Sequence, residues 1–199
     1  MADEGAVSKK GQLGQLFRFR NLKWGVPAIF FYVGAEVAIG TFLTNYIADI
    51  LQISETAANP YVAYYWGGML VGRILGGFLL RLTAPRKVLA LFSTLSVCCI
   101  LLSLFSEGSL AVWSMVLVGL FNSIMFAVIF SLAVAGLGSL TTLASGVLST
   151  AIAGGAVISV LVGVLKDNGT WTLAFMLPAL CYVYIFFYGC YGYKAHRRL

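Results

Sequence analysis

Two ionisable side chains, Glu36 and Arg73, lie inside long apolar stretches of the sequence. An ionisable group within a bilayer is costly, and such residues usually mark the path of a proton or of a polar solute. Glu36 could therefore exchange a proton or bind a polar substrate. The alternative is a structural ion pair with Arg73 between adjacent helices, and for Arg73 itself we favour a structural or gating role.

Four neutral residues inside the apolar stretches could hydrogen bond to a solute or stack against it. Tyr65 and Trp66 are typical either of the aromatic belt at a membrane surface or of platforms for sugar rings. Asn122 lies in an apolar run, so its amide needs a partner, either on another helix or on a substrate. Ser149 belongs to a stripe of small residues, which indicates close helix packing or a surface along which helices slide.

The sequence offers little for enzymatic chemistry. The sole histidine, His196, lies beyond the last apolar stretch, so a serine nucleophile within the membrane would lack a histidine base. The cysteines lie in apolar stretches without metal-binding spacing, and they are Cys98, Cys99, Cys181 and Cys190. We therefore expect no enzyme activity, no cofactor and no metal site.

The apolar stretches are the elements that must position these residues. Only 10% of the 199 residues are charged and mean hydropathy is +0.93, so a soluble fold would leave a large apolar surface in water. Each stretch is near the length that crosses a bilayer as a helix, and backbone groups in lipid must pair within their own segment. We predict an all-α integral membrane protein with six transmembrane helices. The predicted spans are Val26–Ile50, Pro60–Leu82, Val88–Phe105, Leu110–Ala135, Thr142–Leu165 and Trp171–Tyr193.

The charges predict how the spans are oriented, because Lys and Arg accumulate in short cytoplasmic loops. If six helices alternate, one side holds eleven of the bases, which are Lys9, Lys10, Arg18, Arg20, Lys23, Arg81, Arg86, Lys87, Lys194, Arg197 and Arg198. The other side holds Asp49, Glu55, Glu107 and Asp167, with Lys166 as its one base. Both termini should therefore be cytoplasmic, and the net charge of +6 is a topology signal rather than a nucleic-acid footprint.

Three domains follow from this pattern. Residues 1–23 are predicted to form a cytoplasmic linker or tail, 24–194 the six-helix transmembrane bundle, and 195–199 a second cytoplasmic tail. For the first segment, a helix on the membrane surface is the alternative, because aromatic and basic residues alternate from Phe17 to Arg20.

Three strings carry a resemblance to a known family: FYVGAEVAIGTFL (31–43), YWGGMLVGRILGG (65–77) and MFAVIFSLAVAGLG (125–138). They resemble bacterial sugar:proton symporters of the fucose and glucose/galactose type, within the major facilitator superfamily. The resemblance covers nearly the whole chain. It implies a twelve-helix fold of two six-helix halves around a central cavity, in a bacterial inner membrane, and this chain is similar only to the carboxyl-terminal half.

By this resemblance, helices seven, eight, ten and eleven face the cavity, which makes Glu36, Tyr65, Trp66, Asn122 and Ser149 the substrate-side candidates. The residues expected to have structural or gating roles are Arg73, Arg81, Arg86 and Lys87. The superfamily's cytoplasmic signature usually contains an acid, and residues 77–87 have none. This departure puts a charge-relay gate at that loop in doubt.

The leading hypothesis is proton-coupled sugar transport, with this chain supplying the carboxyl-terminal half of the path. The expected partners are a sugar, protons, the lipid bilayer and either a separate amino-terminal half or a second copy, and no nucleic acid. A half-bundle has nothing to rock against, so we expect no transport by the chain alone. The alternative is a truncated or split gene product without activity of its own.

Overall fold

The computed structural model describes residues 14–193, and within this range every regular element is a helix. The elements are α2 (Arg20–Leu51), α3 (Glu55–Leu82), α4 (Pro85–Phe105), α5 (Gly108–Asn122), α6 (Met125–Val134), the 3₁₀ turn η1 (Gly138–Leu140), α7 (Thr141–Thr150), the 3₁₀ turn η2 (Ala151–Ala153), α8 (Gly154–Asp167), α9 (Trp171–Phe187) and the π-helical turn η3 (Tyr188–Gly192).

Local sequence explains where several helices begin. Ser54 precedes α3, and its hydroxyl accepts a hydrogen bond from the backbone N–H of Ala57 at 3.3 Å. Thr170 caps α9 in the same way through the N–H of Leu173, also at 3.3 Å. Pro85 occupies the first turn of α4, where its missing N–H costs nothing. These caps satisfy backbone donors that a helix leaves free at its start.

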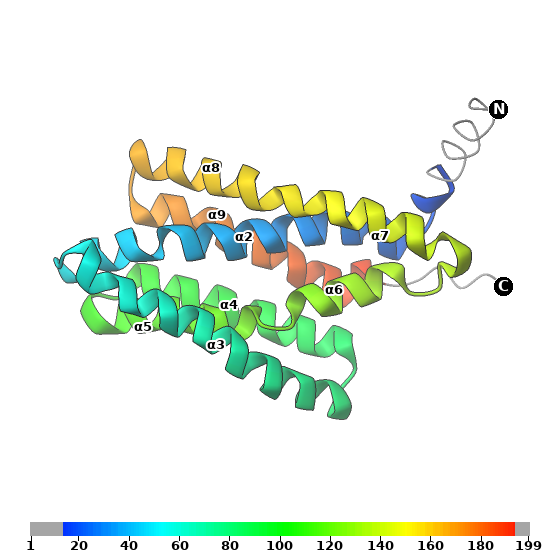
Figure 1. Cartoon of the computed structure of the whole chain (residues 1–199), viewed down its shortest axis with the longest axis horizontal. Coiled ribbons are helices and arrows are strands. Elements are labelled where there is room, and N and C mark those ends of the chain that lie inside the picture. The colour runs from blue at the N-terminus through cyan, green and yellow to red at the C-terminus, as the bar shows by residue number, and fades with distance from the viewer. Residues whose placement is uncertain (1–13, 194–199) are drawn as a thin grey trace.

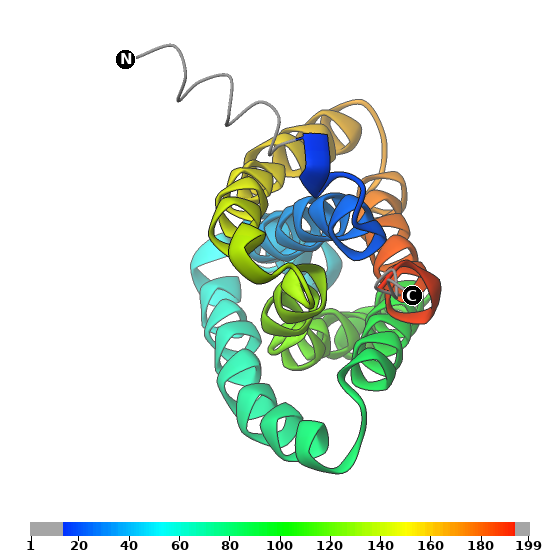
Figure 2. The same cartoon turned by 90° about the vertical axis from the view of Figure 1, so that its right-hand side faces the viewer.

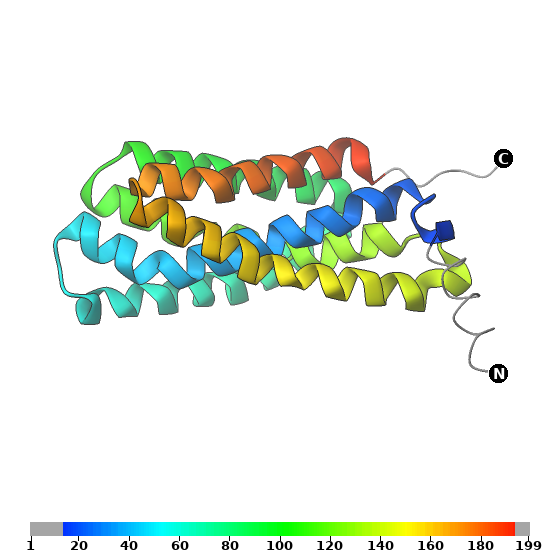
Figure 3. The same ribbon diagram turned by 90° about the horizontal axis from the view of Figure 1, so that it is seen from above.

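The helices run up and down along one long axis (Figures 1 and 3). The start of α2, the end of η3 and the α3–α4 and α6–α7 connections lie at one end, which we call the basic end. The opposite, acidic end holds the α2–α3, α4–α5 and α8–α9 connections.

This arrangement confirms that the bases at the described loop positions, apart from Lys166, share one end. Within residues 14–193, the bases at the basic end are Arg18, Arg20, Lys23, Arg81, Arg86 and Lys87. The acidic end holds Asp49, Glu55, Glu107 and Asp167 together with Lys166. The predicted contributions of Lys9, Lys10, Lys194, Arg197, Arg198 and the tail 195–199 lie outside the described residues. The cytoplasmic placement of the basic end stays a prediction.

The prediction of six spans is confirmed only in part. Five helical segments of the described chain are long and apolar enough to cross a membrane: Arg20–Leu51, Pro85–Phe105, Gly108–Val134, Gly138–Asp167 and Trp171–Gly192. The helix α3 has 28 residues but is not among them. Its tyrosines, tryptophan, glycines and Arg73 make it less apolar than the other segments.

Helix α2 lies inside the bundle and packs against α3, α6, α8 and α9, while α3 lies along one outer edge (Figure 2). Helix α2 begins at Arg20, four residues before the predicted start of the bundle at residue 24. Leu22 is fully buried, so the bundle core continues to the very first turn of this helix.

Three glycines let α3 pack closely on the α5–α6 segment. A Cβ atom on Gly68 would lie 3.4 Å from the backbone nitrogen of Leu120, and one on Gly76 would lie 2.6 Å from Cδ1 of Ile124. On Gly72 a Cβ would overlap the backbone oxygen of Leu120. Small residues at a four-residue spacing allow such backbone approach between membrane helices.

Candidate functional site

A break in one predicted span lies at the centre of the site. The predicted helix Leu110–Ala135 divides into α5, which ends at Asn122, and α6, which begins at Met125. The last carbonyls of a helix lack intrahelical partners. Tyr32 of α2 donates its hydroxyl to the backbone oxygen of Asn122 at 2.9 Å. The break is thus stabilised by a side chain from another helix.

The side chain of Asn122 joins two further helices. Its Oδ1 accepts a hydrogen bond from the hydroxyl of Tyr182 on α9 at 2.7 Å, and its Nδ2 donates to the hydroxyl oxygen of Tyr65 on α3 at 2.9 Å. All of these side chains are at most 1% exposed. We call Tyr32, Tyr65, Asn122 and Tyr182 the Asn122 cluster. It links α2, α3, α5 and α9 through neutral hydrogen bonds inside the bundle.

The burial of Asn122 bears on its predicted role. Both heteroatoms of the amide bond to tyrosines, and the residue is fully buried. In this conformation Asn122 therefore forms hydrogen bonds to other helices, which is one of the two roles considered from the sequence. A substrate hydroxyl would reach Asn122 only after the cluster opened.

Glu36 lies one turn along α2 from Tyr32 and is half-buried. The hydroxyl of Tyr65 donates to the backbone oxygen of Glu36 at 3.2 Å, so Glu36 adjoins the Asn122 cluster. Within residues 14–193 no ion pair joins Glu36 to Arg73, since Lys166 with Asp49 is the one ion pair of that range. The structural ion pair considered from the sequence is absent here, and Arg73 is an exposed residue of α3.

Trp66 lies beside the next turn of α2. Its side chain is 46% exposed, and its ring contacts that of Tyr65 edge to face at 5.2 Å between centroids. A Cβ atom on Gly40 would lie 2.9 Å from Cζ2 of Trp66, so the glycine makes room for the indole. Glu36, Tyr65, Trp66 and Asn122 thus lie in one region of the bundle, and their role toward a substrate stays a prediction.

Ser149 does not join this group. It is exposed on α7, and its hydroxyl donates to the backbone oxygen of Ser145 at 2.9 Å. A surface pocket of about 480 Å³ runs along α7, lined by Ser139, Thr142, Leu143, Gly146, Val147 and Thr150. The gating candidates Arg81, Arg86 and Lys87 are all exposed at the basic end.

Sequence reasoning missed Tyr182. Helix α9 contains the tyrosines Tyr182 and Tyr184, and Tyr188 follows in η3, so residue type alone does not single one out. The available signal was the need of a buried hydroxyl for a partner, which could have been matched to the amide of Asn122.

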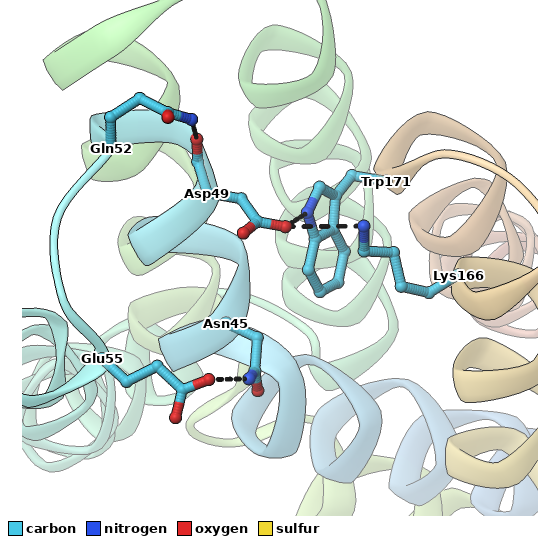
Figure 4. Close-up of polar contacts among 6 residues, drawn as sticks. All are labelled: Asn45, Asp49, Gln52, Glu55, Lys166 and Trp171. Atoms are coloured by element: carbon cyan, nitrogen blue, oxygen red, sulfur yellow. Dashed lines mark hydrogen bonds and ion pairs between the residues drawn. The ribbon is translucent and has the colours of Figure 1, made fainter.

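The acidic end contains a second polar group (Figure 4). Oδ2 of Asp49 accepts a hydrogen bond from Nε1 of Trp171 at 2.8 Å and lies 3.4 Å from Nζ of Lys166. The same ammonium lies 4.6 Å from the centroid of the Trp171 ring. These contacts join the ends of α2 and α8 to the start of α9. Next to them, Nδ2 of Asn45 donates to Oε1 of Glu55 at 2.8 Å.

An all-helical bundle with five membrane-length apolar segments and a buried polar cluster at mid-length is the architecture of an integral membrane protein. No family model matches the sequence. The chain is 44% identical over 195 residues to the glucose/galactose transporter of Brucella abortus (strain 2308), which covers 97% of this chain and 47% of the relative. It is 32% identical over 191 residues to the L-fucose-proton symporter of Escherichia coli (strain K12), covering 94% and 43%.

A solved structure of FucP, a transporter of the major facilitator superfamily in the outward conformation, superposes with a TM-score of 0.88 and 30% identity. It covers 92% of this chain and 44% of that one. The chain belongs to the major facilitator superfamily, and it spans about half the length of the relatives it matches. Because these relatives are transporters, they confirm the prediction that the chain is not an enzyme.

Proposed function

We propose that this chain forms the carboxyl-terminal half of a proton-coupled sugar transporter in a bacterial inner membrane. All six helical segments, α3 included, cross the bilayer, and both termini are cytoplasmic. The names of the relatives, the half-length match and the placement of bases at one end support this proposal.

The observation that carries the proposal is the position of Glu36. Its carboxyl group is half-buried near the middle of a membrane-length helix, and no cation of residues 14–193 pairs with it. A carboxylate that forms no ion pair is costly at this depth, so a proton that neutralises it can be taken up and released as the bundle moves. Glu36 is therefore the proposed proton-binding residue.

The neighbouring residues divide into two roles in this proposal. Trp66 is partly exposed beside Gly40, one helical turn from Glu36, and presents an aromatic face on which a sugar ring stacks. Tyr65 and Asn122 are buried, and they hold α3 and α5 against α2 rather than contacting sugar in this conformation. Ser149 remains a substrate-side candidate from the exposed surface of α7.

The exposed face of α3 indicates that a second helical bundle packs against this chain. Arg73 is exposed about nine residues before the end of a 28-residue helix, at a depth where a charged side chain is costly against lipid. We infer that a separate amino-terminal half, or a second copy of this chain, covers this face and encloses an aqueous path. Alternating access then moves one bundle against the other.

Reconstitution tests this function. The purified chain is placed in liposomes alone, and in parallel together with the half of the B. abortus transporter that it does not match. We expect uptake of labelled galactose, driven by an imposed proton gradient, only when both halves are present. Proton-driven uptake by the chain alone, shown to be monomeric by cross-linking, contradicts the proposal, and so does an assembled pair that binds no sugar.

A further inference from the structure

The first turn of α4 carries positive charge that the described chain does not neutralise. Arg86 and Lys87 follow Pro85 there, while Ala84 at the N-cap supplies no capping side chain and the turn contains no acid. A helix N-terminus has a partial positive charge and unpartnered N–H groups. Two cations at this position repel the helix end, and a bound anion would relieve that repulsion.

No acid in the described range lies near enough to serve. Four of the five acidic residues between 14 and 193 belong to the acidic end, and Glu36 lies near the middle of α2. The one ion pair of these residues is also at the acidic end. An anion that satisfies Arg86 and Lys87 must therefore come from outside the described part of the chain.

The start of α4 lies beside η3 (Figure 2). A surface pocket of about 260 Å³ lies between these two elements. It is lined by Arg86, Lys87, Ala90, Gly189, Cys190 and Tyr191. A Cβ atom on Gly189 would lie 3.3 Å from the backbone nitrogen of Ala90, so η3 approaches α4 closely. The lining thus combines two cations with small residues such as Ala90 and Gly189.

Tyr193 fixes one of these cations. Nη1 of Arg86 donates to the hydroxyl of Tyr193 at 2.5 Å, and Cζ of Arg86 lies 5.3 Å from the centroid of that ring. A guanidinium group has five N–H donors, so several remain for an oxyanion. The Arg86 side chain is thus held at the pocket with most of its donors free of Tyr193.

We propose that this pocket binds the phosphodiester headgroup of an anionic phospholipid, with Arg86 and Lys87 contacting the phosphate and Tyr193 positioning Arg86. Arg86 and Lys87 lie in the first turn of the membrane-length segment Pro85–Phe105, and the ends of such segments meet lipid headgroups. Leu91, one turn along α4 from Lys87, is 51% exposed and offers apolar surface for an acyl chain. A lipid, unlike free phosphate, meets both the charge and this apolar surface.

Native mass spectrometry of the full chain in detergent, titrated with phosphatidylglycerol or phosphatidylcholine, tests the proposal. We expect stronger binding of phosphatidylglycerol. R86Q and K87Q should each weaken it about fivefold, as expected for the loss of one base near an anionic headgroup. R81Q is the matched control, because Arg81 is an exposed base at the same end that does not line the pocket.

A90L provides a second variant that keeps both cations and fills the pocket, and circular dichroism shows that each variant is folded. It should also weaken binding of phosphatidylglycerol. The proposal is overturned if R81Q lowers the affinity as much as R86Q, if phosphatidylcholine binds equally well, or if A90L leaves binding unchanged. It is also overturned if inorganic phosphate displaces the lipid at equal concentration, because the site would then serve a free anion. None of these outcomes depends on transport activity.

Discussion

The hydroxyl group of Tyr182 donates to Oδ1 of Asn122 at 2.7 Å. The two residues are 60 positions apart in sequence, they belong to α9 and α5, and both side chains are fully buried. A buried amide or hydroxyl group without a hydrogen-bond partner destabilises an apolar interior, and this bond gives each of the two groups a partner. It ties α9 to the break between α5 and α6, next to the carboxyl-bearing turn of α2.

Replacing Asn122 by Ala should destabilise the bundle. The hydroxyls of Tyr65 and Tyr182 would both lose their partner on this side chain, and we expect a loss of about 2 kcal/mol in the free energy of unfolding. Titration with SDS from a mild detergent, followed by circular dichroism, measures it. Y182F removes one hydroxyl and should cost about half as much. An N122A variant as stable as the wild type would show that the cluster does not hold the helices together.

Glu36→Gln should separate proton coupling from sugar movement in the assembled transporter. The amide keeps the size of the side chain but cannot take up a proton, so accumulation against a gradient should be lost while exchange of labelled for unlabelled sugar continues. Both assays use the same proteoliposomes. E55Q makes the same change at an exposed residue of the acidic end and should leave accumulation intact. Gradient-driven accumulation by E36Q would remove Glu36 from the coupling step.

The sequence was sufficient to predict an all-helical membrane bundle and five of its membrane-length segments, because hydrophobic length and helical periodicity are local properties. Glu36, Tyr65, Trp66 and Asn122 were selected as polar residues in apolar runs, and they lie together. The break after Asn122 was not predicted. No proline or glycine marks it, and a tertiary hydrogen bond from Tyr32 stabilises it.

Two further differences between the sequence-based expectations and the structure also arise from tertiary packing. Glu36 and Arg73 form no ion pair, and Arg73 lies on the exposed face of α3. Which face a residue occupies depends on how its helix is rotated in the bundle. Ser149 shares its polarity with the site residues but lies on an exposed surface of α7. Helix rotation depends on packing among all the elements, which a single sequence does not display.

Two glycines of α3 offer a matched pair for testing helix packing. Gly72→Ala places a methyl group against the backbone oxygen of Leu120 and should cost about 1–3 kcal/mol. Gly67→Ala meets nothing within 4 Å and should stabilise the helix by up to about 1 kcal/mol, since alanine favours helices over glycine. Thermal unfolding in detergent measures both. Equal effects of the two substitutions would mean that α3 does not pack on α5 as described.

The contacts of Asp49 should contribute little to stability despite their number. The side chains of Asp49 and Lys166 are 55% and 31% exposed, and exposed ion pairs are worth less than about 1 kcal/mol because water and salt screen them. Lys166→Met keeps the apolar stem and removes the charge, so we expect a loss below about 1 kcal/mol that shrinks further as sodium chloride is added. Trp171→Phe removes the hydrogen bond to Asp49 and retains an aromatic ring against Phe175, whose ring stacks on Trp171 with centroids 5.3 Å apart. The free energy of unfolding of each variant, measured at low and high salt, tests this expectation. A large, salt-independent loss in K166M would instead make this charge pair a principal support of the acidic end.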